Sequence, residues 1–156
     1  MIENRQVSRR AGRAQGPVRP DVALLRRLPR SPNVVVLVDD VRSSTIRALG
    51  YGAGLFPRRL SGVHVRVNPR AAARLEDEWV RRLPGVLLTQ IECAGGSVAE
   101  SLRPLVASEA ASDGPVVVVL PERRTPVFGA LATGGSSGIL RQLQDIPDTW
   151  VVTLAA

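Results

Sequence analysis

Five apolar runs, separated by longer polar stretches, divide the chain after residue 32. They occupy residues 33–39, 62–67, 86–92, 115–120 and 150–154. The first and fourth runs are continuously apolar and β-branched, which is typical of strands covered on both faces. The second alternates valines with His64 and Arg66. We therefore expect the second strand nearer an edge of the sheet, with His64 on an exposed face.

The spacers between these runs are too long for hairpin turns, and they carry helical patterns at residues 43–51, 69–82, 97–111 and 138–144. Parallel strands require crossovers of this kind. Ser97 and Glu100 have the spacing of a capping box, and Pro69 suits a first helical turn. The sequence predicts a three-layer α/β fold with an open, five-stranded, parallel sheet. Residues 33–156 form one domain in this interpretation.

The positive charge of the chain is concentrated before this domain. The formal net charge is +7, yet residues 1–30 hold eight arginines against two acids, whereas residues 31–156 hold thirteen arginines against twelve acids. We interpret residues 1–32 as a basic flexible leader or linker with a short apolar patch at residues 22–25. Because the remainder is nearly neutral and aromatics are 3% of the chain, a nucleic-acid partner is disfavoured.

The sequence lacks the signals that identify several other classes of protein. One cysteine, Cys93, permits no internal disulfide, and no Cys/His cluster has zinc spacing. The apolar runs are far shorter than the roughly 20 residues of a membrane span. His64, the sole histidine, has no nucleophile signature nearby. We expect a cytoplasmic domain, non-catalytic, with no metal site, lying at the cytoplasmic face of the membrane if it belongs to a permease.

Ligands of open parallel sheets bind beyond the carboxyl ends of the strands, where the strand order reverses. Asp39 and Asp40 follow the first run, where a carboxylate can hold a ribose hydroxyl or a metal. An aspartate at this position also caps the following helix. We favour capping for one of the two and leave the other open.

Two further loops reach the same edge of the predicted sheet. Gly134, Gly135, Ser136 and Ser137 precede the last expected helix, where backbone N–H groups can face a phosphate. The alternative is a flexible loop with a serine N-cap. Arg123 and Arg124 follow the fourth run and either meet phosphates or remain solvated.

The segments VVVLVDDVRSSTIRALGYG and LSGVHVRVNPRAAARLEDEW carry a family resemblance. They closely resemble the universal-stress-protein-like cytosolic domain at the C-terminus of actinobacterial permeases, which transport amino acids or potassium and belong to the amino acid/polyamine/organocation superfamily. The resemblance continues through IECAGGSVAESLRPLV, VVVVLPERRTPVFGALA and WVVTLAA, so it covers residues 33–156.

This resemblance implies an adenine-nucleotide site of the kind that ATP-binding universal stress proteins have. Asp39 matches the aspartate closing the first strand, and Val65 and Val67 match positions bordering adenine. The Gly134 to Ser137 segment matches the phosphate-binding glycine and serine. The chain departs from ATP-binding members at residues 120–123, where Leu-Pro-Glu-Arg replaces a G-x-x-G pattern. Some related permease domains bind cyclic di-AMP, and the resemblance makes Arg42, Arg123 or Arg124 the candidate phosphate partners in this chain.

The resemblance favours a regulatory domain, requiring no cofactor, that senses cyclic di-AMP, ATP or AMP. Its partner is a membrane permease, in cis or in trans, and the leader resembles a juxtamembrane linker near anionic lipid. The alternative is a degenerate universal-stress fold without a small-molecule ligand, serving as a dimerisation or protein-interaction module. Because residues 150–154 would be an open edge strand and family members often dimerise there, we expect a homodimer.

Overall fold

A computed structural model describes residues 31–93, 96–121 and 135–155. These residues form alternating strands and helices. In chain order the elements are β1 (Asn33–Leu37), α3 (Ser43–Gly54), β2 (Arg59–Arg66), α4 (Pro69–Arg82), β3 (Leu87–Glu92), α5 (Val98–Asp113), β4 (Val116–Pro121), α6 (Gly135–Leu143) and β5 (Thr149–Leu154). The strand order is β3-β2-β1-β4-β5, and every pair is parallel. The predicted five-stranded parallel sheet is confirmed.

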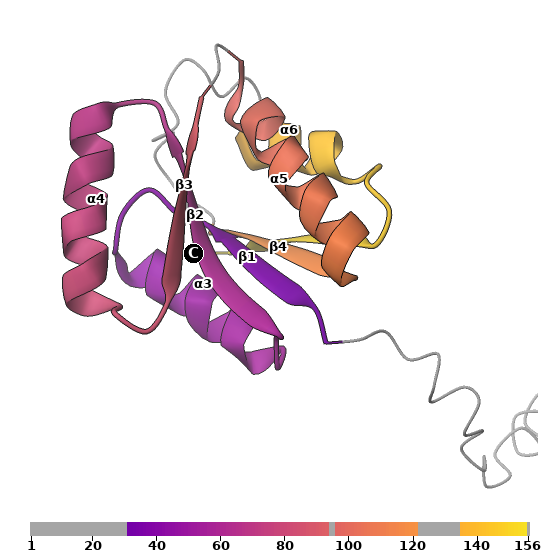
Figure 1. Cartoon of the computed structure of the whole chain (residues 1–156), viewed down its shortest axis with the longest axis horizontal. Helices are drawn as coiled ribbons and strands as arrows, with labels where there is room; N and C mark the ends of the chain where they lie inside the picture. The colour runs from indigo at the N-terminus through magenta and orange to yellow at the C-terminus, as the bar shows by residue number, and fades with distance from the viewer. Residues whose placement is uncertain (1–30, 94–95, 122–134, 156) are drawn as a thin grey trace, which may run out of the picture.

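Helices cover both faces of the sheet, α3 and α4 on one side and α5 and α6 on the other (Figure 1). The central strand β1 supplies both cores, because successive side chains point to opposite faces. Val34 and Val36 join the core beneath α3 and α4, whereas Val35 and Leu37 join the core beneath α5 and α6. This two-sided burial explains why the first apolar run has no polar interruption.

The second strand lies where it was predicted, but the environment of its histidine differs from the prediction. β2 lies next to the edge strand β3, but it is hydrogen-bonded on both sides, to β1 and to β3. The prediction that His64 lies on an exposed face is wrong, since this residue is 6% exposed. Here the polar residue in the alternating pattern marks a buried hydrogen-bonded side chain, not a solvated face.

Side-chain caps begin two of the helices as local sequence rules require. Asn68 accepts hydrogen bonds from the N–H groups of Arg70 and Ala71, and Pro69 follows in the first turn of α4. The predicted capping box of α5 is confirmed, because the Ser97 and Glu100 side chains each accept the other's backbone N–H. The helices therefore begin at defined points on the carboxyl edge of the sheet.

Candidate functional site

The order of the strands places a topological switch point between β1 and β4. The chain runs from β1 through β2 to β3 on one side, then crosses to β4 and β5 on the other. Helix α3, which follows β1, contacts both β1 and β4. Ligand crevices of open α/β sheets lie at such points, outside the carboxyl ends of the strands. The loop from Asp39 to Arg42 occupies this position.

Asp40 and Arg42 form a local pair in this loop. The Arg42 backbone N–H donates to Asp40 Oδ1 at 3.1 Å, and Arg42 Nε lies 3.2 Å from Asp40 Oδ2. The Arg42 side chain is 77% exposed. The prediction that one of the two aspartates caps α3 is wrong in position: the N-cap is Arg42, with no side-chain cap hydrogen bond. Asp40 binds the backbone of the N-cap residue itself.

Asp39 lies beside the buried imidazole of His64. His64 Nδ1 is 2.8 Å from the Val38 carbonyl oxygen and 3.6 Å from Asp39 Oδ1. Because a carbonyl oxygen only accepts, Nδ1 is the nitrogen that carries the proton. Both side chains are more than nine-tenths buried. His64 thus fastens the start of the crevice loop to β2, a role that sequence reasoning missed.

A second contact fastens the same loop to α4. Arg82 Nη1 donates to the Val41 carbonyl oxygen at 2.7 Å and to Glu78 Oε1 at 2.9 Å. The crevice loop is therefore held by β2 at Val38 and by α4 at Val41. No sequence pattern signals this contact, since arginine at the end of a helix more often serves the helix terminus itself.

The two valines expected beside adenine lie in different surroundings. Val65 is buried in the core that faces α5, whereas Val67, just after β2, is 46% exposed. Of the two, Val67 presents surface to a ligand at the carboxyl edge. Their contact with adenine stays a prediction.

The phosphate-binding candidates are only partly within the described residues. Arg123, Arg124 and Gly134 lie outside them. Gly135, Ser136 and Ser137 form the first turn of α6, which begins at Gly135 and not at residue 138 as the pattern predicted. The first N–H groups of a helix have no partner within it. That backbone donors at these three residues bind a phosphate stays a prediction.

No three His, Cys, Asp or Glu residues of residues 31–93, 96–121 and 135–155 gather as a possible metal site. Among those same residues, no helix combines the length and the apolar character that crossing a bilayer needs.

The fold is that of an open parallel α/β domain with a topological switch point between β1 and β4. Comparison with protein families is more specific. The family model described as the KimA potassium transporter C-terminal domain matches residues 30–154, and the chain belongs to this family. The expected link to a permease is confirmed to the extent that the family is a domain of a potassium transporter. No curated protein matches the sequence.

Proposed function

We propose that this domain regulates a potassium permease by binding an adenine nucleotide, namely cyclic di-AMP, ATP or AMP, in the crevice beyond Asp39. It does so without catalysis and without a required cofactor. The observation that carries the proposal is the position of the Asp39 to Arg42 loop at the strand-order reversal in a transporter-family domain. A cytoplasmic position beside the permease follows from this role.

Arg42 is the described side chain best suited to a phosphate. Its present partner is Asp40, in a pair whose arginine is mostly solvated. Exposed ion pairs contribute only about 0 to 1 kcal/mol, so exchanging Asp40 for a phosphate is inexpensive. Guanidinium groups match phosphate oxygens in a bidentate geometry. The amino end of α6 adds backbone donors and a favourable helix dipole.

Asp39 suits a ribose hydroxyl because a carboxylate accepts hydrogen bonds from hydroxyl donors. His64 and the Val38 carbonyl hold the backbone beside it. Because the loop is already held in place, ligand binding loses less conformational entropy than it would with a solvated loop. This smaller loss favours affinity. In this proposal Asp39 and His64 position the ligand and the loop, and neither side chain transfers a proton.

Isothermal titration of the full chain with cyclic di-AMP, ATP and AMP tests the proposal. We expect one of them to bind, and we expect Arg42→Ala to weaken it about 10- to 100-fold, the loss of one charge-assisted hydrogen bond of about 1.5–3 kcal/mol. Arg74→Ala is the matched control, since it removes the same charge from an exposed position on α4. Absence of heat with all three nucleotides would refute nucleotide sensing.

A second copy of the chain is the proposed partner at β5. This strand ends the sheet, and Trp150 on it is 51% exposed. An open edge strand with an exposed aromatic side chain favours association. Sedimentation should show a dimer, weakened by Trp150→Lys; a monomer at high micromolar concentration contradicts it. A dimer that binds none of the three nucleotides would favour the alternative function, an interaction module.

A further inference from the structure

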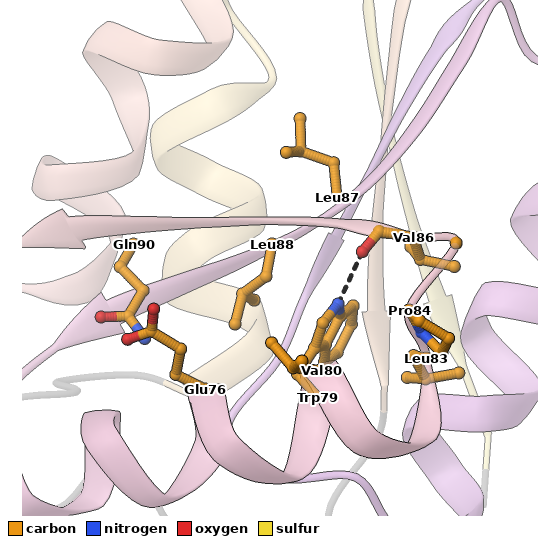
Figure 2. Close-up of a pocket in the computed structure, with 10 residues that line it drawn as sticks. Glu76, Trp79, Val80, Leu83, Pro84, Val86, Leu87, Leu88 and Gln90 are labelled. Carbon is orange, nitrogen blue, oxygen red and sulfur yellow. Dashed lines mark hydrogen bonds between the residues drawn. The ribbon is translucent and has the colours of Figure 1, made fainter.

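A groove lies between α4 and the edge strand β3 (Figure 2). Its volume is about 470 Å³, and its apolar lining includes Trp79, Val80, Leu83, Pro84, Leu87 and Leu88. Val80 and Leu87 are 66% and 56% exposed. Apolar side chains gathered at a concave surface are typical of a docking site.

A buried tryptophan forms the floor of this groove. Trp79 is 2% exposed, and its Nε1–H donates to the Val86 carbonyl oxygen at 2.7 Å (Figure 2). Among the described strands β3 ends the sheet on this side, and none of them pairs with its outer edge. An extended or helical segment laid here would cover the apolar rim and shield this edge.

The N-terminal segment of the same chain has matching chemistry. Residues 22–25 are Val-Ala-Leu-Leu, and Arg26 and Arg27 follow directly. Glu76, on α4, lines the groove and is exposed. Four apolar residues followed by two cations therefore complement an apolar groove with a carboxylate beside it.

Geometry places this segment within reach. Residue 33 begins β1 at the amino edge of the sheet, the edge at which β3 also begins at Leu87. β1 and β3 are separated by β2 alone, which is about 10 Å at the usual strand spacing. The eight steps of the backbone from Leu25 to Asn33 can span up to about 26 Å. A tether of this length gives an effective concentration in the millimolar range, so even a weak contact is populated.

We propose that residues 22–25 dock in the groove between α4 and β3, with Arg26 or Arg27 beside Glu76. The contact covers the edge of β3 and ties the basic segment to the domain. It lies outside the nucleotide crevice and goes beyond the proposed function, because it gives the domain a second, intramolecular partner.

Disulfide trapping in the full chain tests this docking. In a Cys93→Ser background, Ala23→Cys is combined with Val80→Cys on the groove rim or with Phe56→Cys as the control. Phe56 is 83% exposed and lies two residues before Arg58, whose N–H binds the Pro32 carbonyl at the point where the segment enters the fold. Tethering alone therefore favours the control pair.

With a mild thiol oxidant, we expect the 23/80 pair to close within one chain about tenfold faster than the 23/56 pair, as a contact of about 1.4 kcal/mol implies. Leu24→Asp should abolish this advantage. Equal closure rates for the two pairs overturn the proposal. Disulfides formed between two chains also overturn it, because they identify a second copy as the occupant.

Hydrogen exchange gives a second readout that needs no introduced cysteine. In the otherwise unchanged chain, Leu24→Asp should accelerate exchange of the amides at residues 87 and 88 and leave those of β5 unchanged. Unchanged exchange at residues 87 and 88 contradicts the docking of residues 22–25.

Discussion

Gly62→Ala perturbs the point where β2 meets α4. A Cβ added at Gly62 would lie 2.5 Å from Trp79 Cη2 and 2.8 Å from Cζ2. The indole cannot withdraw easily, because it is almost fully buried and its Nε1–H is bonded to the Val86 carbonyl. Either Trp79 shifts and strains that hydrogen bond, or the strand and helix separate.

The loss of stability can be worked from these contacts. Overpacking a core costs about 1–3 kcal/mol, and a weakened hydrogen bond adds about 0.5–1.5 kcal/mol. Alanine recovers about 0.5–1 kcal/mol of the backbone entropy that glycine loses on folding. We therefore expect Gly62→Ala to destabilise the domain by about 0.5–4 kcal/mol, the balance of these three contributions.

Urea unfolding of the full chain measures this loss, with Gly50→Ala as the matched control. Gly50 lies in α3, and a Cβ there would meet nothing within 4 Å. The same substitution should therefore stabilise at Gly50 by about 0.5–1 kcal/mol, the helix preference for alanine over glycine. Opposite signs at two glycines would isolate the steric cause.

A double-mutant cycle identifies the clashing partner. Trp79→Phe removes the outer ring atoms that the new Cβ meets, so Gly62→Ala should cost less in that background. If Gly62→Ala leaves stability unchanged, or costs the same with phenylalanine at position 79, the reasoning about this contact is refuted.

Two smaller predictions concern α5. The Arg103 side chain donates hydrogen bonds to Asp145 and so holds the pKa of that carboxyl below its ordinary value. The stabilisation is present above the ordinary pKa and is lost as the pH falls through the lowered one; an NMR titration should show the pKa returning upward in Arg103→Gln, and no change would contradict the pairing. Ser97→Ala should cost about 0.5–2 kcal/mol by thermal or urea unfolding, and Ser97→Gly only a few tenths; equal costs would argue against a capping role.

Local patterns predicted the elements well because each rule acts over a few residues. Pro69 and the apolar face of α4 defined a helix whose observed bounds, Pro69–Arg82, match the prediction. Ser97 and Glu100 did the same for the start of α5. Continuous β-branched runs identified β1 and β4, since both faces of these strands are covered.

The features that failed depend on partners distant in the sequence. Burial of His64 is tolerated because the Val38 carbonyl accepts a hydrogen bond from its ring. The pattern of a single strand does not reveal that partner. The cap of α3 was misplaced because Asp40 binds the Arg42 backbone instead of the helix. The groove exists because β3 ends the sheet. The alternation of apolar and polar residues within one strand does not predict the order of the strands.

The hydrogen bond from Arg82 to the Val41 carbonyl connects the crevice loop with the groove. It joins the crevice loop to the end of α4, three residues beyond Trp79 on the groove floor. A ligand that displaced the loop would change the free energy of docking in the groove. Reciprocity then requires that docking change the ligand's affinity by the same factor. Occupancy of one surface is then measurable as a change of affinity at the other, and loss of the Arg82 side chain should uncouple them.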